Sequence, residues 1–272
     1  MEKCIEIINK IPIISPDNKL KFCWDFVIML TILLHFFFLV FDLTFENPTF
    51  HDFYQKWLEL LIVLLPIDVL IKINSGFFAN GAPIKDRKEI LLKYRKTDLP
   101  YDLINFITLM LNVQFENFLF SVQSAHVIQV LYFVKYPIFQ HLIQNFEEII
   151  NFDEKVEAFV SLLKLFIKML FFAHLVACLW YYIGISGDED GINWLSAKGF
   201  SHKSTFFQYI VSLYWAITTI STTGYGDITA QNEDEFIFCL LVMIMGSIFF
   251  GYSITYIGKV FDKFQKDQIM KK

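Results

Sequence analysis

The sequence has little charge, few cysteines and no recognisable catalytic pattern. Charged residues make up 19% of the 272 residues, whereas a soluble domain of this size carries about a quarter. The four cysteines are scattered and match no zinc-site spacing, and no nucleophile stands in a pattern with a base or with metal ligands. We therefore expect neither an enzyme nor a resident cofactor, and no nucleic-acid partner. We expect no cleavable signal peptide, because the first apolar run is followed by Asp42 and a polar loop without a small-residue cleavage site.

Long apolar runs dominate what remains. Hydrophobic residues make up 55% of the chain, and a run of about 20 apolar residues can cross a hydrocarbon layer of roughly 30 Å as a helix. A seventh, shorter run, Phe206–Ile220, is followed by glycines and suits a re-entrant helix within surrounding lipid. The sequence thus predicts an all-α membrane protein with six transmembrane helices. The six segments are Trp24–Phe41, Trp57–Ile73, Pro100–Phe115, Phe118–Phe146, Val156–Ile185 and Phe236–Val260.

The basic residues are distributed unevenly between the two sides of this layout. With six crossings, the Lys and Arg residues before the first segment, between the second and third, and after the sixth all share one side. Only Lys56, Lys198 and Lys203 fall in loops on the other. Since basic residues are enriched in cytoplasmic loops, we expect both termini in the cytoplasm of a multi-pass protein of the plasma membrane.

A Thr-Thr-Gly-Tyr-Gly-Asp run follows the short seventh segment. A dehydrated potassium ion needs oxygens that replace its water, and rings of backbone carbonyls supply them. Such carbonyls require backbone angles that alternate in handedness, which Gly224 and Gly226 permit because they lack a Cβ. In other proteins a run of this kind is sometimes merely a polar turn. Here it lies between two expected spans, which favours the filter. The predicted filter consists of Thr222, Thr223, Gly224, Tyr225 and Gly226, with potassium at the first four.

The same segment resembles the pore loop of the potassium channel superfamily, whose usual filter is Thr-Val-Gly-Tyr-Gly. Thr223 stands at the valine position, so its hydroxyl needs a partner behind the filter. The resemblance implies that Trp215 lies near Tyr225 and Tyr214 near Asp227, where they support the filter. One strand supplies only one carbonyl per layer, so four subunits are required. We expect a homotetramer, with a hetero-tetramer as the alternative.

Further motifs look like the ether-à-go-go, hyperpolarisation-activated and cyclic-nucleotide-gated group of this superfamily. They are Phe207–Trp215, Ala173–Tyr181, Asn193–Leu195 and Met245–Gly251. Members that pass sodium and calcium lack the Gly-Tyr-Gly run, so the resemblance favours a potassium-selective member. It implies a cytoplasmic N-terminus at 1–21, a degenerate voltage-sensor-like four-helix domain at 22–150, a two-helix pore domain at 151–264 and the start of a tail at 265–272. The cyclic-nucleotide-binding domain usual in the group is not in this chain, so we expect no cyclic-nucleotide site.

The fourth segment departs from a voltage sensor, which carries Arg or Lys at every third position. Lys135 is its one fixed positive charge, and moving one charge through the field is worth only about 2.3 kcal/mol per 100 mV. We therefore expect weak or no voltage dependence. The acids that would face a sensor, Asp68 and Asp102, remain. Either Lys135 pairs with one of them and locks the domain, or both are solvated near the cytoplasmic surface beside Lys72 and Lys96.

The leading interpretation is a potassium-selective channel subunit that conducts through a tetrameric pore. The alternative is a non-conducting structural subunit that retains the channel fold in a larger membrane complex, and a third hypothesis, a poorly selective cation channel, depends on Thr223 alone. In the sixth segment, Gly246 and Gly251 are candidates for flexing or for close packing against a neighbouring helix.

Overall fold

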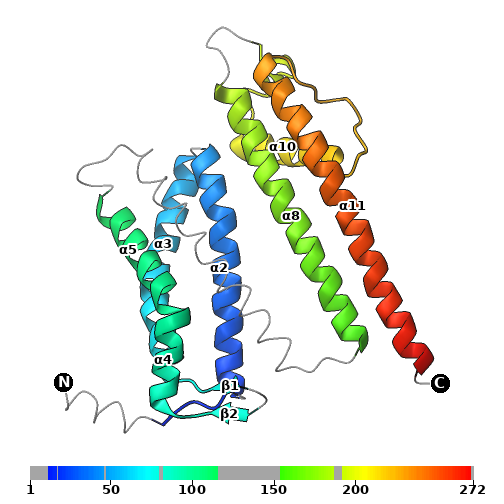
Figure 1. The fold of residues 1–272 in the computed structure, drawn as a ribbon. Coiled ribbons are helices and arrows are strands. Elements are labelled where there is room, and N and C mark those ends of the chain that lie inside the picture. The colour runs from blue at the N-terminus through cyan, green and yellow to red at the C-terminus, as the bar shows by residue number, and fades with distance from the viewer. Residues whose placement is uncertain are drawn as a thin grey trace. The chain divides into compact units, whose positions relative to one another are not determined.

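A computed structural model describes residues 12–16, 18–45, 47–79, 82–115, 154–186 and 192–270 (Figure 1). The chain divides into two compact units. The first contains Met1–Leu39 and Thr49–Asn151, and the second contains Val40–Pro48 and Phe152–Lys272. We describe each unit by itself.

The first unit is helical, with one short hairpin. Its elements are α2 (Lys19–Phe45, as far as Leu39), α3 (Pro48–Ile73), β1 (Phe77–Ala79), β2 (Ala82–Ile84), α4 (Arg87–Thr97) and α5 (Leu99–Phe115). The strands pair antiparallel, with Phe77 opposite Ile84 and Ala79 opposite Ala82. Aromatic contacts join α2 to α3: the His35 ring stacks on Tyr54 with centroids 5.8 Å apart, and Phe38 meets Trp57 edge-on at 5.2 Å.

Helix α4 has well-defined ends. Asp86 precedes it in an extended conformation, and its carboxylate accepts the backbone N–H of Lys88 at 3.2 Å, which satisfies one unpaired donor of the first turn. The backbone N–H of Asp98 donates to the Tyr94 carbonyl at 3.0 Å and closes the last turn. Helix α5 begins at the next residue, Leu99.

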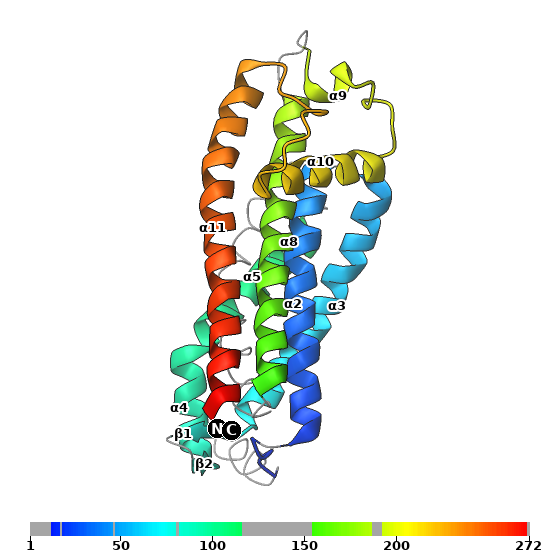
Figure 2. The same cartoon turned by 90° about the vertical axis from the view of Figure 1, so that its right-hand side faces the viewer.

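The second unit is built around two long helices. It contains the end of α2 together with α8 (Glu154–Ser186), α9 (Trp194–Ala197), α10 (Thr205–Ile220) and α11 (Glu233–Met270). Helices α8 and α11 run side by side, and the short α10 runs across them rather than along them (Figures 1 and 2). The core is rich in tryptophan: Trp180 and Trp194 are fully buried and Trp215 is nearly so.

Within the described part of the chain, three helices are long and apolar enough to cross a membrane, and they match the first, fifth and sixth expected spans. They are Lys19–Phe45, Val156–Ser186 and Glu233–Lys263. The second and third expected segments are also helical, as α3 and α5, and Leu99–Met110 is a shorter apolar helix. The fourth, Phe118–Phe146, lies outside the described residues. Helix α10 has 16 residues, fewer than the roughly 20 that a span needs.

Candidate ion-conducting site

The beginning of α10 is held by side-chain hydrogen bonds. Ser204 caps the helix by accepting the backbone N–H of Phe207 at 3.4 Å. The buried Gln208 accepts the Tyr181 hydroxyl of α8 at 3.1 Å, and its amide donates to the Phe200 carbonyl at 3.0 Å. A buried amide is costly unless it is hydrogen-bonded, so these contacts fix where α10 starts.

A stack of tryptophans holds the middle of α10. The Trp215 ring lies on Trp180 of α8 with centroids 3.9 Å apart and planes 11° apart. Trp180 also stacks on Trp194 at 5.5 Å, and the Trp194 indole N–H donates to the Trp180 carbonyl at 3.3 Å. Gly184 makes room for this stack, because a Cβ built there would lie 2.4 Å from Nε1 of Trp194. Three buried indoles thus tie α8, α9 and α10 together.

A buried carboxylate joins the loops on either side of α10. Glu235, in the first turn of α11, is fully buried. Its two oxygens accept the backbone N–H groups of Trp194 at 3.0 Å and Gln231 at 2.7 Å. Hydrogen bonds to a charged acceptor are among the stronger ones in proteins, so Glu235 holds α9 and the loop before α11 in register.

The loop that follows α10 is attached by its N–H groups, which leaves its carbonyls open. The N–H groups of Thr223 and Gly224 both donate to the Thr218 carbonyl, at 2.9 Å and 3.1 Å, and that of Thr222 donates to the Thr219 carbonyl at 3.1 Å. Among the described residues, no donor is bonded to the carbonyl oxygens of Thr222–Gly226. The stretch Thr222–Asp227 is exposed in the single chain. These oxygens are therefore available to a cation.

The backbone of this loop alternates in handedness. The φ angle is +59° at Thr222, +53° at Gly224 and +73° at Gly226, and the described residues between them have negative φ. A Cβ at either glycine would meet nothing within 4 Å, so it is the backbone conformation that calls for glycine there. The expected alternation at the two glycines is observed. Thr222 was expected in the filter, but the sequence did not indicate its positive φ, a strained left-handed angle for a β-branched residue.

The expected supports of the loop are only partly observed within one chain. The Tyr214 hydroxyl donates to Oδ2 of Asp227 at 2.8 Å, which confirms that these two residues meet. The ring stacked on Tyr225 is also that of Tyr214, with centroids 6.4 Å apart and nearly parallel planes. Trp215, expected at that position, instead lies in the tryptophan stack with Trp180, because its side chain is on the buried side of α10.

The additional hydroxyl of Thr223 does have a partner. Its Oγ1 lies 2.9 Å from Oγ of Ser221, the C-cap residue of α10. Ser221 in turn donates to the Thr218 carbonyl at 3.3 Å. The hydroxyl that replaces valine is therefore joined to the end of α10, a contact for which the sequence offered no specific partner.

The two glycines considered for α11 differ in their surroundings. A Cβ at Gly246 would lie 3.2 Å from Cα of Ile220, so α11 packs closely against the end of α10 at that point. A Cβ at Gly251 would meet nothing within 4 Å in the described chain. Close packing is thus observed for Gly246 and not for Gly251.

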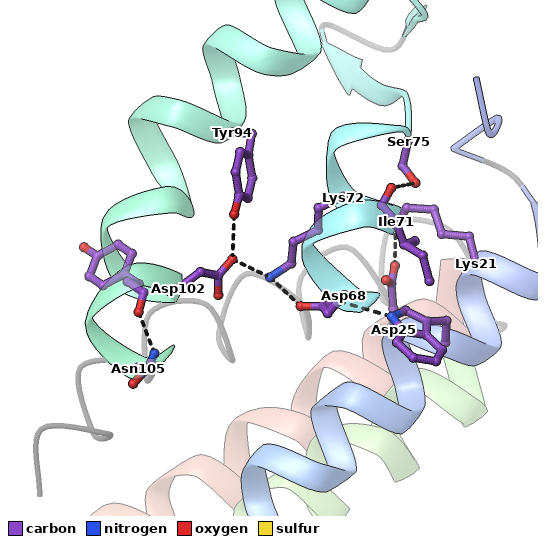
Figure 3. A network of polar contacts seen from close by, with 11 residues as sticks. Lys21, Asp25, Asp68, Ile71, Lys72, Ser75, Tyr94, Asp102 and Asn105 are labelled. Atoms are coloured by element: carbon purple, nitrogen blue, oxygen red, sulfur yellow. Dashed lines mark hydrogen bonds and ion pairs between the residues drawn. The ribbon is translucent and has the colours of Figure 1, made fainter. Parts of the chain in front are cut away.

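A charge cluster lies in the first unit, where Figure 3 shows Lys72 of α3 between two acids. The Lys72 ammonium is 2.7 Å from Oδ2 of Asp68 and 3.3 Å from Oδ2 of Asp102 of α5. The Trp24 indole N–H donates to the other Asp68 oxygen at 3.1 Å. The two acids are only 1% and 5% exposed, so the expectation that both are solvated is wrong. Lys135 lies outside the described residues, and its pairing stays a prediction.

The cluster extends to α4, which is outside the apolar segments. The Tyr94 hydroxyl donates to Oδ2 of Asp102 at 3.3 Å (Figure 3). Burial, and then the nearby Asp102 carboxylate, raise the pKa of the Tyr94 phenol above its usual range. Tyr94 therefore stays protonated at neutral pH and keeps its donor role.

The ion pair between Asp68 and Lys72 could have been predicted from the sequence, whereas the burial of Glu235 could not. Asp68 and Lys72 are four residues apart, so they share a face of a helix and could have been paired in advance. Glu235 follows Glu233 and Asp234, and such a group at a helix start is equally compatible with a solvated N-terminal turn. Its burial arises from loops that meet only in the folded unit.

The family model for "Ion transport protein" matches residues 21–269. The chain belongs to this family. It is similar to "Potassium channel AKT2/3" of Arabidopsis thaliana, with 23% identity over 85% of the chain, and to "Potassium channel AKT1" of the same plant, with 28% identity over 65%. It is also similar to "Potassium voltage-gated channel protein eag" of Drosophila melanogaster, with 24% identity over 92%.

These relatives confirm the resemblance to the potassium channel superfamily and its ether-à-go-go-like branch. They are named as channels and not as enzymes, in agreement with the sequence. Together with the long apolar helices, they make the chain a helical integral membrane protein. The chain spans 29%, 20% and 23% of the three relatives' lengths, respectively.

Proposed function

We propose that the chain is a potassium-selective channel subunit and that four copies form one pore. The observation that carries the proposal is the loop after α10, with left-handed φ angles at Thr222, Gly224 and Gly226 and carbonyls that no described donor occupies. This alternation turns successive carbonyls toward one side of the strand, as a filter that replaces the water of an ion requires. The relatives named as potassium channels support the same ion.

The rest of the proposal completes the membrane arrangement. The chain crosses the plasma membrane six times with both termini in the cytoplasm, and α10 is re-entrant. Thr222, Thr223, Gly224 and Tyr225 coordinate potassium, Gly226 ends the filter, and Tyr214 and Asp227 brace its outer end. In a single chain Tyr225 is 71% exposed, and neighbouring subunits would cover it. Potassium is the permeant ion, and no other cofactor takes part.

The conductance is proposed to depend weakly or not at all on voltage. Lys135 is the one fixed charge of the fourth segment. If it crossed the whole field, four subunits would together gain at most about 9 kcal/mol per 100 mV, and a partial crossing would gain less. The acids that would face such a charge are already paired with Lys72.

Purified protein in a planar bilayer with a potassium gradient tests the proposal. We expect currents that reverse at the potassium equilibrium potential, with a shallow conductance–voltage curve. Gly224→Ala should abolish them, because a Cβ penalises the left-handed angle, whereas Gly258→Ala, at an open position of α11, should leave them. Reversal near zero would indicate a poorly selective cation channel. Silence of a well-assembled tetramer would instead favour the non-conducting structural subunit, and a steep curve would refute the weak voltage dependence.

A further inference from the structure

Helix α4 has two faces of different character. Ile90 and Tyr94 are buried against the first unit, and Tyr94 is anchored through Asp102. The residues on the opposite side recur at three- and four-residue spacing, so they form one stripe. All are exposed, including two leucines at 43% and 55%. The stripe, called here the outer face of α4, consists of Lys88, Leu91, Leu92, Arg95 and Lys96.

The cations of α4 fall into two groups by their contacts. Arg87 donates to the Asn74 side chain at 3.2 Å, and the Lys93 ammonium lies 4.0 Å above the Phe77 ring, so both act within the fold. Lys88, Arg95 and Lys96, on the outer face, form no ion pair with any residue that the structure describes. Within the part of the chain that the structure describes, three cations around two exposed leucines therefore have no ion-pair partner.

The position of α4 places this face beside the apolar helices. A single residue, Asp98, separates α4 from α5, and α5 exposes Leu103, Ile104 and Ile107 as a lipid-facing helix would. Helix α4 lies at the end of its unit where α2 begins and the β1–β2 hairpin projects (Figures 1 and 2). In the proposed topology that end faces the cytoplasm.

We propose that the outer face of α4 docks on the anionic phospholipid headgroups of the cytoplasmic leaflet. Lys88, Arg95 and Lys96 meet phosphate oxygens, while Leu91 and Leu92 enter the boundary between headgroups and acyl chains. Interfacial helices bind in this way, through an apolar strip flanked by Lys and Arg, and cytoplasmic leaflets carry the complementary negative charge. The inference rests on the membrane orientation of the proposed function and not on ion conduction.

Native mass spectrometry of the detergent-purified full chain tests the docking. Wild type should retain phosphatidylglycerol in preference to phosphatidylcholine, and the preference should fall as salt rises. The triple variant Lys88→Gln/Arg95→Gln/Lys96→Gln should lose about a hundred-fold in phosphatidylglycerol retention, because each of the three cations contributes roughly five-fold near an anionic surface. The matched control Lys198→Gln/Lys203→Gln removes exposed charges of the other unit and should retain the lipid.

Leu92→Gln supplies a second variant in which all three cations remain. It should weaken retention less than the triple variant does, because it removes only the apolar contact. Wild-type retention by the triple variant would overturn the docking, and so would an equal loss in the lysine control, since either result would mean that the face is not the binding site. The reversal potential reports separately on the proposed function: a conducting triple variant without lipid preference leaves the channel intact and supports the docking.

Discussion

Gly184→Ala should destabilise the second unit, although alanine is the better helix former. A Cβ at this position of α8 would lie 2.4 Å from Nε1 and 2.7 Å from Cδ1 of Trp194. Trp194 is fully buried and stacked on Trp180, so the indole can make room only by displacing packed neighbours. Overpacking of a core costs about 1–3 kcal/mol, and we expect a value near the upper end.

Gly258→Ala in α11 is the control for this overpacking cost, because a Cβ at Gly258 would meet nothing within 4 Å. Both substitutions replace a helical glycine and therefore share the propensity gain of about 1 kcal/mol, which cancels in the comparison. The difference between the variants should thus approach 3 kcal/mol, or about 5 °C or more in the unfolding midpoint. Thermal unfolding in detergent, followed by tryptophan fluorescence, measures it.

The double variant Gly184→Ala/Trp194→Phe provides a test of the cause. The smaller ring leaves room for the methyl group, so the two substitutions together should cost less than the sum of their separate effects. Equal midpoints for Gly184→Ala and Gly258→Ala, or strictly additive losses in the double variant, would refute the steric argument.

Two further predictions concern the charge cluster and the loop. Lys72→Met leaves Asp68 and Asp102 buried without their cation, so it should cost about 3–5 kcal/mol and reduce the folded yield, whereas Lys72→Arg should be tolerated; an unchanged yield for Lys72→Met would contradict the pairing. Ser221→Ala and Thr223→Val should show a coupling of about 1 kcal/mol in a double-mutant cycle of thermal stability, the worth of their hydrogen bond, and each should alter bi-ionic reversal potentials. A coupling of zero would mean that the two hydroxyls do not act together.

The helices could be predicted from the sequence because their signals are local. Apolar runs mark α2, α8 and α11, and the short run Phe206–Ile220 ends where α10 ends. The glycines of the loop also predicted left-handed backbone angles, because glycine adopts positive φ at a lower free-energy cost than any other residue. Such features depend on consecutive residues alone.

Contacts between segments that are distant in the sequence could not be predicted from it. The pairing of Lys72 with Asp102 depends on how α3 meets α5, and the burial of Glu235 depends on two loops that come together only in the folded unit. The left-handed Thr222 is imposed by the hydrogen bonds at the end of α10 and not by the residue's own preference. The family spacing does not say which side of α10 is covered by Trp180, so the stacking of Trp215 on Trp180 was not foreseen, and the expected nearness of Trp215 to Tyr225 stays a prediction.

The close approach at Gly246 ties α11 to the end of α10. Because the helix backbone there lies against Ile220, two residues before Thr222, a tilt of α11 at that level would carry the base of the loop Thr222–Asp227 with it. Toward its C-terminus α11 passes Gly251 and Gly258, where a Cβ would meet nothing within 4 Å in the described chain, and it stays attached to α8 through the Phe172–Phe249 ring contact and the Lys263–Glu157 ion pair. A bend in α11 on the C-terminal side of Gly246 would therefore leave the carbonyls of the loop at their present spacing.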